Sequence, residues 1–304
     1  MVSKQEFSAN EKYVICSGDL RVEIADLGAT VTGIAFRGRP VLLGYETPEE
    51  YLTGSAYLGA LVGRYANRIA GAAFHLNGKR YALLKNEGEN QLHGGPNAFD
   101  KRRWQAEILE ENSVRFTLFS PDGDNGFPGN LTASVTYTVS GGTLRLDFEG
   151  DSDADTVFAP TSHMYFNLDG AENILDTRMR INCSGYLEVG EGLIPTGRIC
   201  PPEGEFDFSV LRPFGRNYDH CFPLRGEDAC TARAGDIELR IKTDFPAIQL
   251  YTGGGLGAPF GPSRGFAIEP EFYPDSPNHP EFPSPVLRAG EHFHRYAEYS
   301  FRTV

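Results

Sequence analysis

The chain has 304 residues, 40% of them hydrophobic, which is enough to fill the core of one large domain or two smaller ones. Its 28 basic and 41 acidic side chains leave a formal net charge of −13. That charge repels phosphate backbones and anionic lipids, so we expect neither nucleic acid nor a membrane as a partner. No apolar run approaches the roughly 20 residues that cross a bilayer.

The five cysteines have no CxxC spacing, and the first residues lack the apolar segment of a secretory signal. We therefore expect a cytoplasmic protein without a disulfide framework.

Short strands are predicted along most of the chain. Its 35 glycines and 20 prolines are spread rather than clustered, as in folds with many turns. A single short helix is expected at 46–52, and Asn77-Gly78 is the strongest hairpin signal. Alternation of apolar and polar residues predicts strands at 20–24, 29–36, 41–43, 73–76, 79–83, 104–109, 114–119, 131–138, 143–148, 179–181, 185–187, 237–241 and 247–251.

Helical periodicity over three or more turns is absent, and no repeat, low-complexity tract or linker divides the chain. We therefore predict an all-β fold, a large antiparallel β-sandwich with few short helices, in which residues 1–304 form a single domain.

Residues 161–170 place one imidazole in an aromatic run that closes with Asp-Gly. Read as a strand, the run puts His163, Tyr165 and Asn167 on one polar face, with the residues between them in the core. Histidine suits acid–base chemistry near neutrality. A lone histidine in such a run is more often a hydrogen-bonded structural residue, so both interpretations stay open here.

Glu269 and Glu271 point to the same side of a second run, if that run is extended. Two such carboxylates raise one another's pKa unless one is paired or solvated. A solvent-facing acidic strand is the alternative, but the apolar and aromatic neighbours at 266–274 disfavour it.

Arg64 and Arg68 bracket Asn67, and together they offer the donors and acceptors that suit a neutral polyhydroxylated ligand. A surface salt bridge is the alternative for either arginine. His93 precedes two glycines in a polar loop, where binding residues concentrate. Asp219 stands next to a histidine before an apolar stretch, either as a functional group or as a turn residue.

Other motifs are weak or missing. His292, His294 and Glu298 resemble the metal run of cupins, but the second ligand region of that pattern is not found before Val304. Nucleotide-binding loops and the GxSxG elbow are also missing. We therefore expect neither a metal nor a cofactor.

Taken together, the motifs resemble the aldose 1-epimerases, or galactose mutarotases, over nearly the whole chain. They occur in the order of that family: Gly63-Arg64-Tyr65-Ala66-Asn67-Arg68-Ile69, Leu92-His93-Gly94-Gly95, residues 161–170, Tyr218-Asp219-His220, Gln249-Leu250-Tyr251-Thr252-Gly253, and Glu269 followed by residues 274–280. The resemblance implies a galactose mutarotase-like supersandwich and a cofactor-free interconversion of the α and β anomers of a free aldohexose such as galactose or glucose.

The resemblance also implies roles for individual residues. His163 looks like the general acid and Glu269 like the general base. A neighbouring carboxylate such as Asp219 would keep His163 protonated. The sugar-binding partners it implies are Asn67, Arg68, His93, Asp219 and Gln249.

One position departs from the family, which commonly has glutamine where this chain has Glu271. A charged Glu271 would oppose ionisation of Glu269 and shift the pH optimum upward relative to a Glu271→Gln variant.

Three alternatives stay open: a hexose-phosphate epimerase, a non-catalytic carbohydrate-binding β-sandwich, and a glycosidase that uses two carboxylates. The expected partner is a monosaccharide, and the chain is expected to be a monomer or a homodimer.

Overall fold

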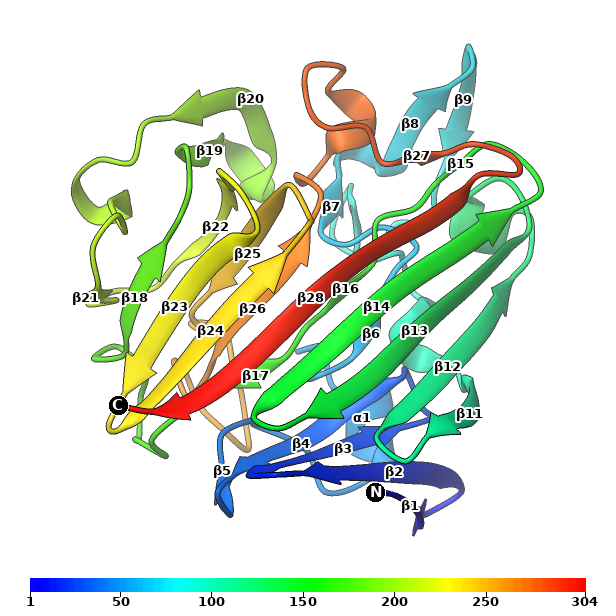
Figure 1. Ribbon diagram of the computed structural model, residues 1–304. Coiled ribbons are helices and arrows are strands. Elements are labelled where there is room, and N and C mark those ends of the chain that lie inside the picture. Colours follow the sequence, from blue (N-terminus) through cyan, green and yellow to red (C-terminus); the bar gives the residue numbers. More distant parts are fainter.

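The amino-terminal strands form a five-stranded antiparallel sheet in which each strand pairs with the next along the chain. The computed structural model describes residues 1–304, and this sheet is drawn in blue in Figure 1. The alternation predicted at 20–24 appears as burial of every second side chain. The strands are β1 (Val2–Phe7), β2 (Asn10–Ser17), β3 (Leu20–Ala25), β4 (Thr30–Phe36) and β5 (Arg39–Pro40).

A nine-stranded sheet spans the molecule in the order β11-β12-β13-β14-β28-β24-β23-β18-β21. Its centre joins distant parts of the sequence, since Thr143 of β14 pairs with Ser300 of β28 (Figure 1). Its strands are β11 (Gln105–Glu110), β12 (Ser113–Ser120), β13 (Leu131–Ser140), β14 (Thr143–Ser152), β18 (Arg178–Ile181), β21 (Arg212–Pro213), β23 (Asp228–Ala234), β24 (Ile237–Thr243) and β28 (His292–Thr303).

A four-stranded sheet, in the order β17-β26-β25-β22, packs one face against the nine-stranded sheet. Phe166, Ile248 and Ile268 belong to the main core, and the ring of Phe166 lies 5.7 Å from that of Tyr299 in β28. The strands are β17 (Tyr165–Phe166), β22 (Asp219–Pro223), β25 (Ala247–Tyr251) and β26 (Phe266–Glu271). The predicted all-β sandwich is confirmed.

The other face of the four-stranded sheet carries polar side chains. In β25 and β26 the core residues alternate with Gln249, Glu269 and Glu271, and Gln249 lies directly opposite Glu269 in the ladder. Asp219 of β22 pairs with Tyr251 in the same way. Because side chains alternate across a strand, residues from several strands meet on one surface.

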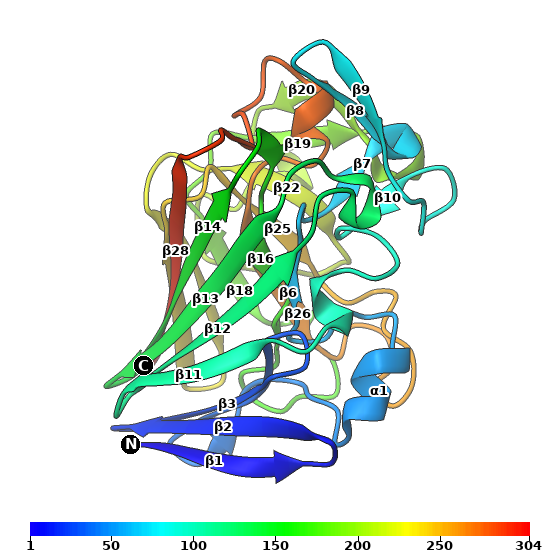
Figure 2. The ribbon, with the colours of Figure 1, turned by 90° about the vertical axis from the view of Figure 1, so that its right-hand side faces the viewer.

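Short ladders and turns cover this polar face. Figure 2 shows α1, β7 and β10 on the side of the molecule away from β28. The two-stranded ladders pair β6 (Leu61–Val62) with β16 (Thr161–Ser162), β7 (Arg68–Ile69) with β10 (Gln91–Leu92), β8 (Ala73–Leu76) with β9 (Lys79–Ala82), β15 (Thr156–Val157) with β27 (Val286–Leu287), and β19 (Tyr186–Val189) with β20 (Pro195–Cys200). Single 3₁₀ turns lie at Ala70–Ala72, Phe99–Lys101, Asp124–Gly126, Glu191–Leu193, Gly204–Phe206 and Ser276–Asn278.

Two local predictions are confirmed. Asn77 and Gly78 join β8 to β9 with positive φ angles of 52° and 77°, as a two-residue type I′ turn requires. The helix α1 (Pro48–Thr53) begins at a capping box formed by Thr47 and Glu50. No helix is long and apolar enough to cross a membrane.

Two other local predictions are wrong. The strand expected at 41–43 is reduced to one bridge between Leu42 and Phe166. Residues 161–170 do not form one strand, because His163 lies between β16 and β17. Asn167 consequently leaves the polar face, and its side-chain amide donates to the carbonyl oxygens of Ala171 and Arg264.

Arg64 has a structural role rather than the ligand-binding role suggested by its position near Asn67. Its guanidinium is buried and donates to Ser120 Oγ and to the carbonyl oxygens of Ser120, Pro121 and Pro128. Burial lowers the pKa of Arg64 to about 10. The planar fork of donors holds neighbouring turns together.

We expect Arg64→Lys to lower the free energy of unfolding by about 2–4 kcal/mol, because an ammonium group cannot satisfy several buried acceptors at once. Urea denaturation measures the change. Arg39→Lys, at an exposed pair with Asp236, is the matched control and should leave the midpoint unchanged. If Arg64→Lys unfolds like the wild type but binds sugar poorly, the ligand-binding role is correct instead.

Candidate active site

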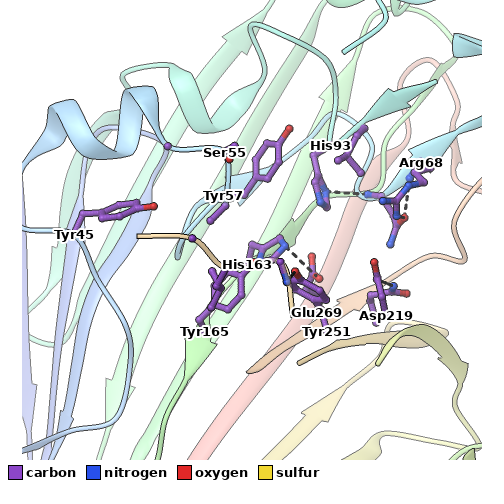
Figure 3. A pocket seen from close by; sticks show the side chains of 18 of the residues that line it. Tyr45, Ser55, Tyr57, Arg68, His93, His163, Tyr165, Asp219, Tyr251 and Glu269 are labelled. Carbon is purple, nitrogen blue, oxygen red and sulfur yellow. Dashed lines mark hydrogen bonds and ion pairs between the residues drawn. The ribbon is translucent and has the colours of Figure 1, made fainter. Parts of the chain in front are cut away.

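A cavity of about 340 Å³ lies on the polar face of the four-stranded sheet (Figure 3). All the site residues put forward from the sequence line it: Asn67, Arg68, His93, His163, Asp219, Gln249 and Glu269. Strands β22, β25 and β26 contribute Asp219, Gln249 and Glu269, and His163 follows β16. The opposite wall comes from the start of β7, with Asn67 and Arg68, and from the turn after β10, with His93. The fold thus gathers residues from six separate segments.

His163 and Glu269 form the one ion pair between two residues that line the cavity. Nε2 of His163 lies 3.5 Å from Oε1 of Glu269, and both side chains are buried. Burial lowers the pKa of His163 to about 4. Burial, and secondly the charge of Asp219, raises the pKa of Glu269 well above its ordinary value, while Arg68 opposes the rise. Between these two pKa values the pair carries one proton.

The expectation that Asp219 keeps His163 protonated is therefore wrong. Asp219 instead accepts a hydrogen bond from Nε2 of Gln249 and acts on the pKa of Glu269. Desolvation is the largest cause of the lowered pKa of His163, because burial removes the water that would stabilise an imidazolium.

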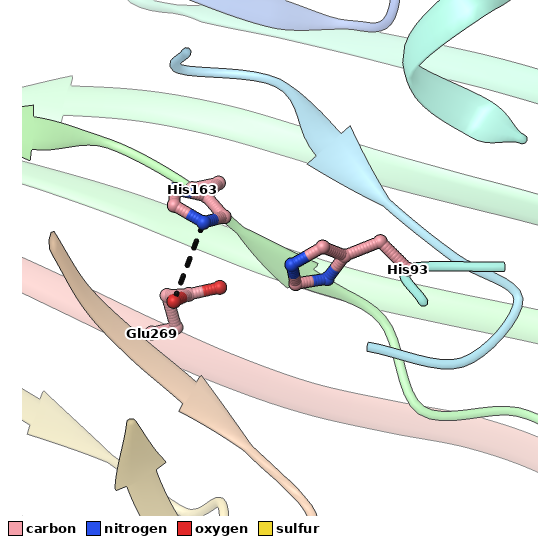
Figure 4. A group of neighbouring side chains, drawn as sticks. All are labelled: His93, His163 and Glu269. Atoms are coloured by element: carbon pink, nitrogen blue, oxygen red, sulfur yellow. Dashed lines mark ion pairs between the residues drawn. The ribbon is translucent and has the colours of Figure 1, made fainter. Parts of the chain in front are cut away.

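His93 is held in one tautomer by the backbone. The N–H of Asn67 donates to Nδ1 of His93 at 3.1 Å, so in the neutral ring the proton is on Nε2. Burial, followed by the neighbouring His163 and Arg68, lowers the pKa of His93 well below its usual value. Nε2–H points toward His163 (Figure 4) and is a donor for a ligand hydroxyl.

Arg68 is the sole lysine or arginine that lines the cavity. Its guanidinium donates to both carboxylate oxygens of Glu87 at 2.8 Å, a bidentate pair that fixes its orientation. The pair leaves little free positive charge for an anionic ligand, while the remaining N–H groups can donate to hydroxyls.

Some buried polar atoms of the cavity residues have no partner. Oε1 of Gln249 and Oε2 of Glu269 accept no hydrogen bond in the protein. Unpaired buried acceptors are uncommon in folded proteins and call for an explanation. A ligand rich in hydroxyl groups would satisfy both.

Tyrosines complete the cavity: Tyr45, Tyr57, Tyr165 and Tyr251 line it, and the sequence motifs included only the last two. The ring of Tyr165 stacks on His163 with the centroids 4.8 Å apart, and that of Tyr57 lies 4.6 Å from His93. Tyr57 had no strand pattern to reveal it. An aromatic residue in the small-residue loop after α1 was the available signal. The partly exposed ring of Tyr57 can lie against the C–H surface of a sugar, whereas Tyr165 is buried against His163.

His93, His163 and Glu269 also form the one group whose ligand atoms could converge on a metal ion, lying within 4.8 Å of one another (Figure 4). A metal-bound histidine normally donates its second N–H to an acceptor. His93 does the reverse, since its Nδ1 accepts from a backbone N–H and its Nε2 keeps the proton. The donor set is therefore poorly suited to a metal.

Glu271 lies on the same face as Glu269 but behind the cavity wall, where it is fully buried. Burial, and secondly the charge of Glu269, raises the pKa of Glu271 well above its ordinary value. This shift favours the uncharged form of Glu271, which weakens the repulsion of Glu269 on which the expected upward shift of the pH optimum depends.

Comparison with known proteins gives a consistent result. The family model described as aldose 1-epimerase matches residues 11–300. The chain is 38% identical to the aldose 1-epimerase of Haemophilus influenzae, over 93% of each chain. It is 37% identical to the galactose mutarotase of Homo sapiens, over 96% of this chain and 94% of that protein.

Solved structures agree. An aldose epimerase homologue from C. elegans superposes with a TM-score of 0.94 at 28% identity, covering 97% of this chain and 99% of the other. Galactose 1-epimerase from Lactobacillus acidophilus superposes with a TM-score of 0.90 at 27% identity, covering 100% and 98%.

The depressed pKa of His163 can be tested directly. In the free protein the ring signals of His163 should move only as the pH falls toward about 4. His292 is an internal reference, since its hydrogen bond to Asp151 raises its pKa above the usual value. Histidine NMR titration measures both. Titration of His163 near pH 6.5 would contradict the account of its burial.

Proposed function

Since this chain belongs to the aldose 1-epimerase family and is an isomerase, we propose that it interconverts the α and β anomers of free aldohexoses such as galactose or glucose. The contact between His163 and Glu269 is the observation that carries this proposal. Residues from β2 to β28 share one core of 62 buried side chains, which supports a single domain over residues 1–304.

The chemistry follows from the structure of the sugar. A pyranose is a cyclic hemiacetal, so its ring opens when the C1 hydroxyl loses a proton and the ring oxygen gains one. Glu269 as carboxylate takes the hydroxyl proton while the bond from C1 to the ring oxygen breaks and a carbonyl forms. His163 as imidazolium protonates the ring oxygen. Rotation about C1–C2 and the reverse transfers give the other anomer.

One proton shared between His163 and Glu269 is enough for this reaction cycle. Transfer from a protonated Glu269 to His163, across the 3.5 Å gap, turns the neutral pair into the working pair without exchange with solvent. Ring opening then leaves the proton on Glu269 again, and ring closure restores it to His163. Each transfer contributes roughly 10²–10⁴-fold to the rate.

The remaining cavity residues are proposed as hydroxyl-binding partners. Arg68 and Nε2–H of His93 are donors, while Asp219 and Oε1 of Gln249 are acceptors. Asn67 lines the wall between the two donors. A sugar hydroxyl both donates and accepts hydrogen bonds, so a cavity with donors on one side and acceptors on the other can bind several of them.

The alternatives fit less well. A hexose-phosphate epimerase needs cations for its phosphate, and Arg68 is already paired with Glu87. A glycosidase needs two carboxyl groups facing the substrate from both sides of the bond, whereas Glu271 does not line the cavity. A carbohydrate-binding module has no use for an acid–base pair in contact.

Polarimetry tests the roles of the pair. Fresh α-glucose and α-galactose should reach equilibrium faster with the protein, and His163→Ala and Glu269→Gln should each lower kcat at least about 100-fold. His75→Ala and Glu89→Gln, both exposed and outside the cavity, are matched controls. Full rates in both cavity variants would mean that the acid and base are wrongly assigned.

The proposed preference for uncharged sugars predicts a lower kcat/KM, by about tenfold or more, for glucose 6-phosphate than for glucose, because a phosphate would lose hydration without a free cation to receive it. The same polarimetric assay compares the two substrates. Equal values would favour the hexose-phosphate epimerase.

A further inference from the structure

We propose that Glu271 is a positioning residue of the sugar site, which acts through Asn67 on His93 and Arg68. This inference rests on the proposed function, since it assigns Glu271 to the same cavity. Glu271 itself does not line that cavity and is fully buried at the end of β26.

The carboxyl group of Glu271 has one hydrogen bond. Oε1 accepts from Nδ2 of Asn67 at 3.2 Å, and Oε2 has no partner. The group takes part in no salt bridge, and Arg68 acts on its pKa only as a distant charge. Its contact with Asn67 is therefore what connects this buried group to the cavity.

Asn67 is the point at which several contacts meet. Its φ angle of 65° lies in the left-handed region, which asparagine tolerates better than most residues. Its N–H donates to Nδ1 of His93, its carbonyl oxygen accepts from the N–H of His93, and its Oδ1 accepts from the N–H of Arg68 at 2.9 Å. Both neighbours depend on how Asn67 is oriented.

The side-chain amide of Asn67 can keep this orientation only if Nδ2 also has an acceptor. With Oδ1 turned to Arg68, Nδ2 faces Glu271, and Asn67 is just 4% exposed. Without that acceptor a buried donor is left unsatisfied, and rotation of the amide to find another partner breaks the bond to Arg68. The backbone of Asn67, whose N–H sets the tautomer of His93, then loses the side-chain restraint on its left-handed conformation and keeps only its hydrogen bond from the N–H of His93.

Nδ2 of Asn67 requires a hydrogen-bond acceptor at position 271, and this acceptor need not be charged. A neutral carboxyl group and a primary amide each present one carbonyl oxygen at the same place, so glutamine is the conservative replacement. Leucine has a similar volume and no acceptor. The two substitutions separate loss of the hydrogen bond from loss of the ionisable group.

Kinetics give the first test. Glu271→Leu should lower kcat/KM about tenfold or more, mainly through a higher KM, because the sugar-binding groups move while the pair of His163 and Glu269 stays in place. Glu271→Gln should stay within about threefold of the wild type, with an unchanged pH–rate profile around neutrality. Glu271→Met is a second apolar variant if the leucine variant does not fold.

Spectroscopy gives the second test, in sugar-free protein, so that it stands apart from the proposed function. Long-range ¹H–¹⁵N spectra should show His93 protonated on Nε2 in the wild type and in Glu271→Gln. In the apolar variant a mixture of tautomers is expected. Failure of the wild type to mutarotate any sugar would overturn the proposed function and leave this readout unaffected.

A double-mutant cycle with Asn67→Ala completes the design, since Glu271→Leu should cost little more once Asn67 is gone. Three results would overturn the inference: an apolar variant with kcat/KM within about twofold of the wild type, an unchanged His93 tautomer in that variant, or an equal loss in Glu271→Gln and Glu271→Leu.

Discussion

One face of the four-stranded sheet packs in the core and the other lines the cavity, and the arrangement of the whole site depends on this division. Every second residue of β25 and β26 packs into the core against the nine-stranded sheet, and the residues between them face the other way. A slip of one residue in either strand would send Glu269 or Gln249 into the core. The apolar face therefore fixes the register that places the polar groups side by side.

Burial then determines the chemistry of those groups. Burial lowers the pKa of His163 and raises the pKa of Glu269 and Glu271, so in all three groups it favours the uncharged form. The formal net charge of −13 describes the whole chain and not the cavity. Within the cavity Arg68 is paired with Glu87, and burial lowers the pKa of both histidines. Such a cavity favours a neutral ligand whose hydroxyl groups replace the missing partners.

Similar side chains acquire different roles from their contacts. Arg64 and Arg68 are four positions apart, yet the first binds carbonyl oxygens in the interior and the second lies at the cavity beside Glu87. The histidines differ in the same way, since a backbone N–H fixes the proton of His93 while His163 contacts a carboxyl group. The residue type defines which hydrogen bonds and charges a side chain can have, and the surrounding residues determine which of these it uses.

Most of the strands, the Asn77-Gly78 turn and the all-β class could be predicted from the sequence, because alternation and turn preferences act over a few residues. The ordered motifs also identified seven of the residues that line the cavity, namely Asn67, Arg68, His93, His163, Asp219, Gln249 and Glu269. Four features depend on the tertiary fold: the structural role of Arg64, the inward turn of Asn167, the place of Tyr57 in the cavity wall, and the lowering of the pKa of His163 by burial. A contact of 3.5 Å between residues 163 and 269, and the hydration that each loses, depend on how distant strands pack, and no local pattern contains that information.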